Sequence, residues 1–199
     1  MVKDGIYYAL GLTAGGLVVS YLASPFYAIP LYLLAAFCLY FFRDPDRSVP
    51  NGPLAVSPAD GKVVAIRQEN SDKTRVSIFM NVFDVHVNRS PIAGKISEVR
   101  YQRGQFMAAN KELASTQNEH NMVTVEAGDT NVTFSQIAGL IARRIVFYKQ
   151  PGDNVNKGER VGLIKFGSRV DVYFGPEWQV TVQEGARVSA GSSVLAKRK

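Results

Sequence analysis

Residues 164–174 read Ile-Lys-Phe-Gly-Ser-Arg-Val-Asp-Val-Tyr-Phe, a pattern typical of a β-strand that is interrupted by a central Gly-Ser pair. Glycine inside a strand weakens it and usually marks a β-bulge or a close backbone approach. On these residues alone, the simplest interpretation of Gly167-Ser168 is a bulge with an ordinary serine. The rest of the sequence has to show whether this pair also has a chemical role.

The sequence on either side of this stretch also predicts β-structure. Short runs of β-forming residues are separated by Gly, Pro, Asn and Asp; they include Lys62–Ile66, Arg75–Phe79, Met122–Val125 and Asn131–Phe134. Helical periodicity is scarce, and the best candidate for a short helix is residues 137–144. This spacing predicts a mostly β fold, a flattened barrel or sandwich.

Two patterns recur 33 residues apart and refine this prediction. SPADGKV at Ser57–Val63 returns as SPIAGKI at Ser90–Ile96, and the glycine-rich stretch from Pro151 returns from Glu184. Glycine corners followed by inward valines resemble the barrel-sandwich hybrid of biotinyl and lipoyl carrier domains. A membrane-tethered carrier or adaptor module without enzymatic activity is therefore one functional alternative. Neither glycine-rich turn shows the lysine pattern that such carriers modify.

The N-terminal part of the chain has a different composition. No Asp, Glu, Lys, Arg or His occurs from Gly5 to Phe42, and two apolar runs flank Ser24-Pro25. One helix over this segment would be about 57 Å long, far beyond a hydrocarbon core of about 30 Å, and proline favours a break. We therefore expect residues 1–42 to form a membrane hairpin, spanning or re-entrant, and residues 43–199 to form the β domain. A secretory signal peptide fits poorly, because the apolar region is too long.

The net charge of +6 lies entirely beyond the hairpin, since Lys3 and Asp4 cancel. An excess of Lys and Arg beside a membrane segment favours the cytoplasmic side and an anionic lipid surface. Nucleic-acid binding is not supported, because no basic run is interleaved with aromatic residues. One cysteine, Cys38, and two scattered histidines have no metal-ligand spacing, so we expect neither a disulfide nor a metal site.

Few residues are candidates for chemistry. The histidines are His86 and His120, and either is more often a structural residue than a catalyst. Ser168, His86 and Asp60 have the residue types of a hydrolase triad, but the sequence lacks the G-x-S-x-G turn of such enzymes. A phosphate-binding P-loop is also missing from the sequence.

Four motifs taken together are more specific than any one of them. In order they are FFRDP at Phe41–Pro45, SPADGKV at Ser57–Val63, FDVHVNRSPIAGKI at Phe83–Ile96 and FGSRVDVYF at Phe166–Phe174. With this order and spacing, the chain closely resembles the pyruvoyl-dependent phosphatidylserine decarboxylases, in particular their short form, which includes archaetidylserine decarboxylase-like proteins. The resemblance covers nearly all of the chain beyond the hairpin.

The resemblance implies a self-cleaving proenzyme. Cleavage between Gly167 and Ser168 would give chains 1–167 and 168–199, and Ser168 would become a covalent pyruvoyl group. That group forms a Schiff base with the substrate amine and accepts electrons as CO₂ leaves. Self-cleavage needs a small residue before the serine, a base for its hydroxyl and donors for the oxyanion.

Residue roles also follow from the resemblance. Asp60 matches the acidic residue that supports self-cleavage in the family. His86 matches the histidine implicated in acid-base catalysis during decarboxylation. Longer family members carry a second histidine three positions on, where this chain has Arg89. Either His86 serves both steps with Asp60, or Asp60 is itself the base for Ser168. Arg169, with Arg89, is a candidate for binding substrate phosphate or carboxylate.

The resemblance further implies a substrate, partners and a location. The substrate would be an anionic serine phospholipid, ester-linked or archaeal ether-linked, and the products an ethanolamine lipid and CO₂. The two cleavage products would stay together as a heterodimer or a higher oligomer. The protein would lie at the cell membrane, with its β domain on the cytoplasmic face.

Overall fold

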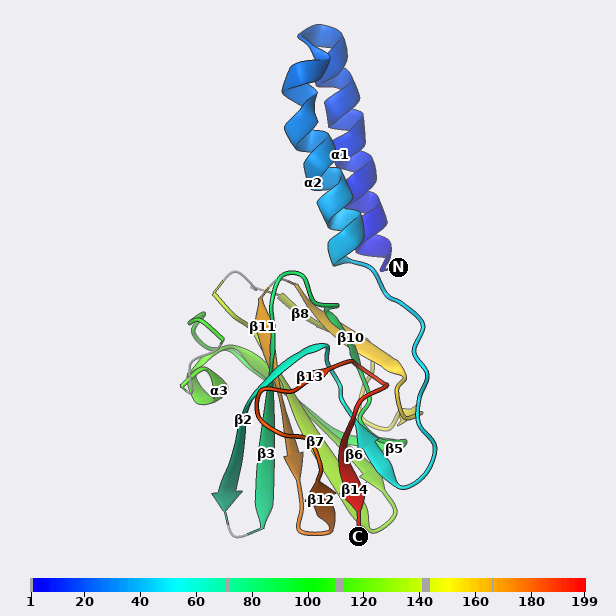
Figure 1. Cartoon of the computed structure of the whole chain (residues 1–199), viewed down its shortest axis with the longest axis vertical. Helices are drawn as coiled ribbons and strands as arrows, with labels where there is room; N and C mark the ends of the chain where they lie inside the picture. The colour runs from blue at the N-terminus through cyan, green and yellow to red at the C-terminus, as the bar shows by residue number, and fades with distance from the viewer. Residues whose placement is uncertain (1, 71, 110–112, 141–143, 166) are drawn as a thin grey trace. The chain divides into compact units, whose positions relative to one another are not determined.

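The computed structural model of the 199-residue chain describes residues 2–70, 72–109, 113–140, 144–165 and 167–199. The chain divides into two compact units, Met1–Asp46 and Arg47–Lys199. The first unit is a pair of helices and the second carries all of the described strands (Figure 1).

The N-terminal unit consists of α1 (Lys3–Leu22) and α2 (Pro25–Phe41). Ser24 caps α2, because its hydroxyl accepts a hydrogen bond from the Phe26 N–H over 3.3 Å, and Pro25 occupies the first helical position. The predicted break at Ser24-Pro25 is confirmed.

Small residues form the contact between the two helices. Buried positions in the helices include Gly5, Ala9 and Gly16 of α1 and Ala28 and Ala35 of α2. Gly16 packs directly on Tyr32, whose hydroxyl also lies 3.2 Å from the Ser20 hydroxyl. Close approach through small residues is typical of helix pairs in membranes, where the hydrophobic effect does not drive helices together.

The larger unit is built from short strands and one single-turn helix. The strands are β1 (Leu54–Val56), β2 (Gly61–Asn70), β3 (Lys73–Met80), β4 (Val87–Arg89), β5 (Gly94–Gln102), β6 (His120–Ala127), β7 (Thr130–Ile137), β8 (Arg144–Phe147), β9 (Asn154–Val155), β10 (Arg160–Lys165), β11 (Ser168–Phe174), β12 (Trp178–Val180), β13 (Arg187–Val188) and β14 (Val194–Arg198), and the helix is α3 (Ala114–Gln117). The prediction of a mostly β fold with an apolar helical pair is confirmed.

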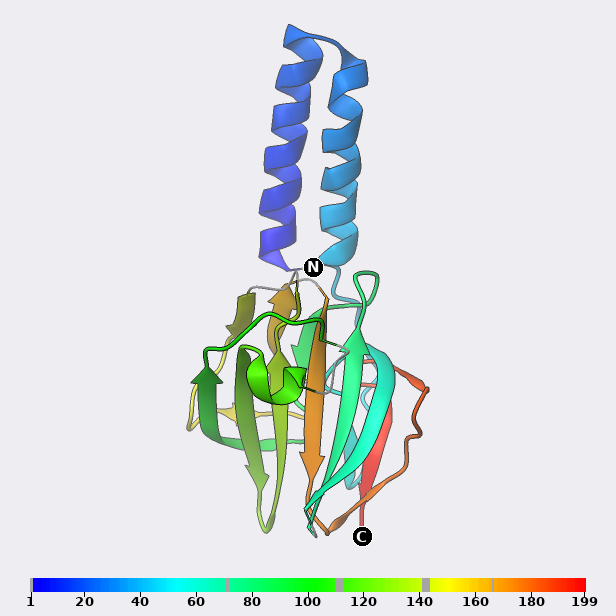
Figure 2. The same ribbon diagram turned by 90° about the vertical axis from the view of Figure 1, so that its left-hand side faces the viewer.

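These strands form three sheets. An eight-stranded sheet has the order β13-β2-β3-β11-β7-β6-β5-β9, and two three-stranded sheets have the orders β1-β14-β12 and β4-β10-β8. The long strands of the large sheet stand side by side, with α3 in front of them in Figure 2. β11 pairs antiparallel with both β3 and β7, so it lies inside the sheet.

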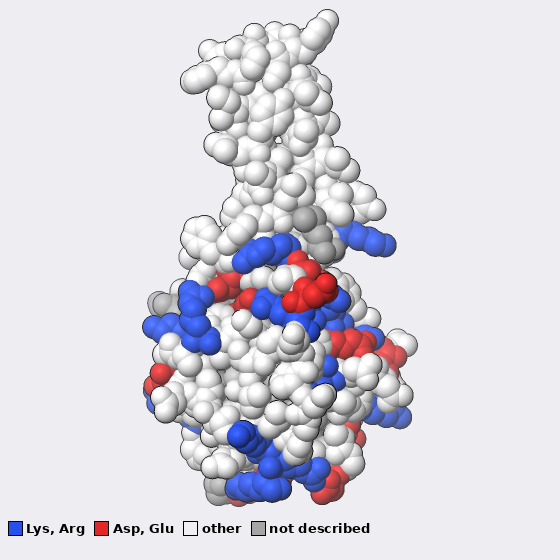
Figure 3. Space-filling model, turned by 45° about the vertical axis from the view of Figure 1, so that its right-hand side comes forward, with Lys and Arg blue, Asp and Glu red and all other residues white. Residues whose placement is uncertain are grey.

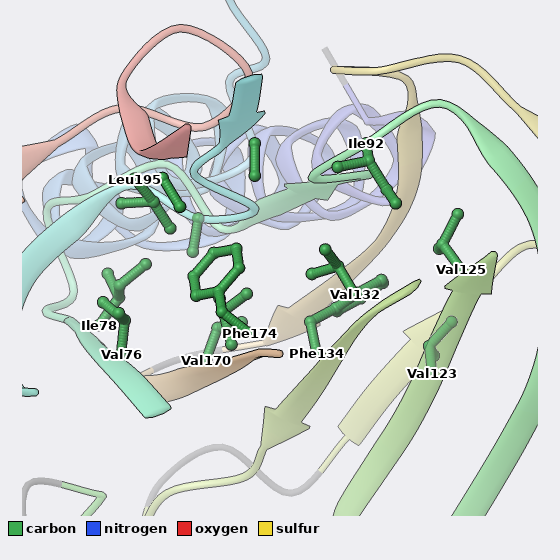
Figure 4. Close-up of a cluster of buried hydrophobic side chains, with 14 of the residues drawn as sticks. Val76, Ile78, Ile92, Val123, Val125, Val132, Phe134, Val170, Phe174 and Leu195 are labelled. Carbon is green, nitrogen blue, oxygen red and sulfur yellow. The ribbon is translucent and has the colours of Figure 1, made fainter. Parts of the chain in front are cut away.

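The core lies between the inner face of the large sheet and the two small sheets. Val76, Ile78, Val170 and Phe174 point into it from β3 and β11, and Leu195 enters from β14 (Figure 4). Since alternate residues of a strand face opposite sides, Arg169 and Asp171 lie on the outer face of the same sheet. Ser168 and Arg169 are neighbours in β11, so their side chains lie on opposite faces of the sheet.

Two local predictions differ from the structure. Residues 164–174 are two strands in two sheets, rather than one interrupted strand: the chain leaves β10 after Lys165 and enters β11 at Ser168. Gly167 therefore lies at a corner between sheets, which is a regular position for glycine.

The predicted helix at residues 137–144 is also wrong for its described residues. Ile137 ends β7, paired with Arg169 and His120, and Arg144 begins β8; residues 141–143 lie outside the described residues. Cross-strand pairing outweighs the local helical periodicity at Ile137.

The glycines of the second repeated pattern are turn residues. Gly152, Gly158, Gly185 and Gly191 have φ values of 100°, 76°, 87° and 76°, in the left-handed region that favours glycine. The internal repeat itself, and the likeness to biotinyl and lipoyl domains, remain predictions.

Candidate active site

Ser168 is buried at one end of the large sheet. Its main chain stands opposite Met80, the last residue of β3. Its side chain is on the inner face with those of Val170 and Val172, and none of the residue is exposed. The hydroxyl donates a hydrogen bond to the Met80 sulfur over 3.4 Å, and a thioether is a weak acceptor. The burial of this hydroxyl is thus poorly compensated, which favours a chemical role over a structural one.

His86 is held in one tautomer beside the strand that leads to Ser168. Its Nδ1 lies 3.0 Å from the Asp84 carbonyl oxygen, which only accepts hydrogen bonds, so Nδ1 carries the hydrogen in this contact. In the neutral ring, Nε2 is therefore the basic nitrogen. The His86 carbonyl accepts a hydrogen bond from the Ile164 N–H over 3.3 Å, which extends the β4–β10 pairing by one residue.

This register brings His86 to the end of the sheet where Ser168 lies. Ile164, opposite His86, is three residues before Gly167. Asn88, two positions after His86 and so on the same side of the strand, accepts a hydrogen bond from Gln136 of β7 over 2.9 Å. His86, which directly precedes β4, therefore lies on the side that faces the large sheet.

Asp60 lies at the same end, next to β2. Its backbone neighbour Gly61 is so close to β3 that a Cβ there would lie 2.2 Å from the Phe79 carbonyl oxygen. The carboxylate of Asp60 accepts hydrogen bonds from Arg47 Nη2 over 2.8 Å and from the Ala190 N–H over 2.7 Å. The carboxylate therefore forms an ion pair with Arg47 and is bonded to the turn after β13 through Ala190.

Strand pairing thus brings Ser168, His86 and Asp60 to one end of the β unit. Residues 56–60 run antiparallel beside residues 87–91, as the hydrogen bonds from Val56 N–H to the Pro91 carbonyl and from Arg89 N–H to the Pro58 carbonyl show. This pairing, continued to Asp60, places it beside residues 86–87. Their roles in chemistry remain predictions.

Arg169 lies on the other face of the sheet from the Ser168 side chain. Its Nε donates to the Asp171 carboxylate over 2.6 Å and its Nη2 donates to the Ser77 hydroxyl over 2.8 Å. Arg169 is 1% exposed and Asp171 is fully buried. The structure therefore gives the Arg169 guanidinium a structural partner, and substrate binding by this residue stays a prediction.

Asp171 is the centre of a polar cluster under α3. It also accepts a hydrogen bond from the Ser115 hydroxyl of α3 over 2.9 Å and contacts Arg75 at 3.4 Å. Burial raises the pKa of Tyr173 to about 12, and the Asp171 carboxylate adds to the rise. The phenol accordingly stays neutral at every physiological pH.

Replacing Arg169 by alanine is expected to lower the free energy of unfolding by about 3 kcal/mol, because the buried Asp171 carboxylate loses its main partner. A loss of about 3 kcal/mol is the lower end of the range for breaking a buried ion pair. We expect the lower end because Arg75 and Ser115 still contact Asp171. Urea denaturation of the Ser168→Ala background, which stays one chain, measures the change. The control Arg67→Ala removes an exposed pair with Glu184 and should cost no more than about 1 kcal/mol. Equal effects of the two variants would contradict a structural role for the Arg169–Asp171 pair.

Arg89 is also buried and packs between two glycine corners. Its Nη1 donates to the Gly158 carbonyl over 3.1 Å, and a Cβ at Gly191 would lie 2.9 Å from its Cδ. His120, on the outer face of β6, is bonded through Nδ1 to the Asn118 carbonyl over 2.8 Å. Contact of Arg89 with substrate remains a prediction, and His120 has the structural contacts expected of it.

The sequence did not indicate three residues that shape this site. Met80 contacts the Ser168 hydroxyl, Arg47 holds the Asp60 carboxylate, and Gly139 lies against the carbonyl of Gly167. Arg47 is visible in the sequence only as a basic residue after Asp-Pro-Asp. Gly139 was hidden within the predicted helix, and no local signal marks Met80.

Comparisons with known proteins agree with the motifs. The phosphatidylserine decarboxylase family matches residues 34–196 of this chain. The chain is 65% identical over 198 residues to the phosphatidylserine decarboxylase proenzyme of Solibacter usitatus (strain Ellin6076), covering 100% of this chain and 97% of that protein. It is 43% identical over 205 residues to the proenzyme of Cupriavidus taiwanensis, with 99% and 95% covered, and 47% identical over 178 residues to that of Desulfotalea psychrophila, with 84% and 82% covered.

Proposed function

Because this chain belongs to the phosphatidylserine decarboxylase family, we propose that Ser168 is the residue that self-cleavage converts into the pyruvoyl group. The activity is that of a pyruvoyl-dependent carboxy-lyase, which converts a serine phospholipid into an ethanolamine phospholipid and CO₂. The observation that carries the assignment to Ser168 is its buried hydroxyl, next to a thioether, at the corner where the chain changes sheets. Full-length similarity to decarboxylase proenzymes makes the carrier-module alternative unnecessary.

Self-cleavage uses only atoms of the chain and one water. The Ser168 oxygen bonds to the Gly167 carbonyl carbon, the C–N bond breaks, and the hydroxyl proton ends on the nitrogen, giving an ester. Loss of the Ser168 α-proton then expels the Gly167 carboxylate. Hydrolysis of the resulting enamine, as its imine tautomer, consumes water, releases ammonia and leaves a ketone at residue 168. The amide bond and the hydroxyl are both consumed.

The fixed strands position this reaction. Ser168 is held by pairing with Met80, and the next residue, Arg169, is locked on the opposite face by Asp171. The new chain end therefore stays in register after the bond has broken. Such positioning lowers the entropy cost of both the cleavage and the later reaction.

The pyruvoyl group, when formed, supplies a ketone that condenses with the substrate amine and accepts electrons as CO₂ leaves. The residues around position 168 fit it, because Met80 and Val170 provide an apolar wall and neither of them is exposed. A water-poor site favours loss of a carboxylate charge. With Nδ1 bonded to Asp84, His86 holds or delivers a proton through Nε2.

We further infer that the helical pair attaches the protein to the membrane. α1, with 20 residues, is about 30 Å long and apolar enough to cross a bilayer, whereas α2, with 17, is about 26 Å. Large apolar side chains are exposed along both helices, among them Leu10, Leu17 and Leu33. Figure 3 shows this surface without charge over most of its length, while Lys and Arg gather on the β unit. That basic excess supports the cytoplasmic face and an anionic lipid substrate. The likeness to the short form of the family is a further proposal.

Removing residues 1–46 is expected to release the β unit from membranes while self-cleavage continues, because every proposed cleavage residue lies in the second unit. The truncation must keep Arg47, which binds Asp60. Sedimentation with washed membranes and a denaturing gel measure the two properties. Continued sedimentation of the truncated protein would show that the helices are not the sole anchor and would implicate the basic surface.

The direct test of the proposed function is denaturing mass spectrometry of the purified protein. Residues 1–167 and 168–199 are expected as separate chains, the second one without a free amine. An intact chain that releases CO₂ from a serine phospholipid would contradict the assignment.

A further inference from the structure

Gly139 makes an unusually close contact with the bond proposed to be cleaved. A Cβ at residue 139 would lie 2.0 Å from the Gly167 carbonyl oxygen, and real Cβ atoms essentially never come within 3.0 Å of another atom. The hydrogen in that direction therefore points at the oxygen, a weak Cα–H···O contact. By contrast, a Cβ at Gly167 would meet nothing within 4 Å beyond its chain neighbours. The lack of space is at residue 139, not at residue 167.

The backbone of Gly139 is held from its N-terminal side. The Ala138 N–H donates to the Glu119 carbonyl over 2.9 Å, and Asn118 Nδ2 donates to the Ala138 carbonyl over 2.7 Å. Asn118 is 1% exposed and also forms two hydrogen bonds with the backbone of Met107, of 2.8 and 3.0 Å. Residue 139 therefore has little freedom to move away from the Gly167 oxygen.

From this contact we propose that Gly139 is a positioning residue for self-cleavage, and that Asn118 supports it. The inference rests on the proposed cleavage at Gly167-Ser168. In that step the Ser168 oxygen bonds to the Gly167 carbon, the C–N bond breaks, and the hydroxyl proton moves to the nitrogen. Attack requires one face of the carbonyl to meet the serine oxygen, and the direction of the carbonyl oxygen decides which face that is. Gly139 restricts the direction of this carbonyl oxygen. Its Cα–H also contacts the oxygen while negative charge develops there during attack.

The role ends when the bond breaks. Afterwards the Gly167 oxygen belongs to a free carboxylate at the end of chain 1–167 and no longer has to be aligned with residue 168. Gly139 should therefore matter for the rate of self-cleavage and much less for decarboxylation by chains that have cleaved. A residue that only supports the fold would affect both.

The experiment compares Gly139→Ala with Gly94→Ala in the full-length chain, synthesised in the presence of phospholipid vesicles. Gly94 is a matched control, because a Cβ at this residue would lie 2.1 Å from the Glu126 carbonyl oxygen. Gly94 begins β5, which is three strands away from β11 in the sheet. Cleavage is followed over time on denaturing gels, thermal unfolding is recorded for uncleaved chains in the Ser168→Ala background, and CO₂ release is measured per cleaved chain.

Gly139→Ala is expected to slow cleavage by about 10²-fold, because the contact must open by about 1 Å and misplacement of that size has such an effect. Gly94→Ala should lose a similar amount of thermal stability and still cleave at nearly the normal rate. The fraction of Gly139→Ala chains that do cleave should release CO₂ at a nearly normal rate. Normal cleavage by Gly139→Ala, or equal slowing by both variants, would overturn the proposal.

A second variant covers the case in which Gly139→Ala fails to fold. Asn118→Asp keeps glycine at 139 but replaces the donor to Ala138 with an acceptor, and should cleave more slowly than the wild type. Normal cleavage by Asn118→Asp in that case would also overturn the proposal. A wild-type chain that does not cleave at all would instead refute the proposed function, which the inference requires.

Discussion

Ser168→Ala is expected to leave a single chain of 199 residues with no decarboxylase activity, whereas the wild type separates into residues 1–167 and 168–199. The reason is chemical: the alanine side chain has no hydroxyl that could attack the Gly167 carbonyl carbon, and without that attack no pyruvoyl group forms. The loss should therefore be complete, unlike the partial losses from positioning residues.

The fold should survive this change. The Ser168 hydroxyl makes its hydrogen bond to the weak Met80 acceptor, so its removal should cost less than about 1 kcal/mol of stability. Ser135→Ala is the matched control, because Ser135 is buried on the neighbouring strand β7 and its hydroxyl has no partner among the described residues. That variant should cleave and decarboxylate normally.

Denaturing mass spectrometry and CO₂ release from a serine phospholipid in vesicles measure both variants. Cleavage of Ser168→Ala at the same bond would contradict the assignment, as would activity of the uncleaved chain. Loss of cleavage in Ser135→Ala as well would indicate a general sensitivity of the sheet rather than a reaction at Ser168.

His86→Ala is expected to reduce turnover by about 10²–10⁴-fold in chains that have cleaved, the usual contribution of a well-placed acid or base. The carbanion left by loss of CO₂ needs a proton near neutral pH, and imidazole is the side chain suited to supply it. The Asp84 carbonyl fixes the tautomer and so makes Nε2 the atom that exchanges this proton. CO₂ release per cleaved chain measures the effect.

Asp60→Ala is expected to block self-cleavage itself. A carboxylate accepts protons but has none to donate, so this side chain suits the first step better than the last. Because Asp60 also holds the Ala190 N–H, Asp60→Asn is the sharper variant: the amide oxygen still accepts that bond, while the charge is gone. Failure of Asp60→Asn to cleave, with normal thermal unfolding, would assign the effect to the charge.

The two steps can be told apart by gel and by CO₂ release on the same samples. Cleaved His86→Ala with near wild-type turnover would return His86 to a structural role. A complete failure of His86→Ala to cleave would instead indicate that this histidine serves both steps. Normal cleavage by Asp60→Ala would remove Asp60 from self-cleavage.

Local residue patterns were enough to predict several features of this protein. Proline and a long charge-free run predict two helices with a break at Ser24-Pro25, because these effects act within a few residues. Alternation of apolar residues predicts strands such as β3 and β6 for the same reason. The ordered motifs indicated the family, and through the resemblance they predicted the reactive bond, because the motifs contain the residues expected to take part in the chemistry.

Only the tertiary structure decided how the site is built. It showed that residues 164–174 belong to two sheets, because hydrogen-bond partners from distant strands decide where one strand ends and the next begins. It turned Arg169 away from Ser168, since neighbouring residues of a strand face opposite sides and Asp171 captures the guanidinium. It also placed Gly139 against the Gly167 carbonyl. This contact involves main-chain atoms alone, so the types of side chain in the sequence do not predict it. The sequence alone predicted which bond reacts, and long-range strand pairing determined which residues surround that bond.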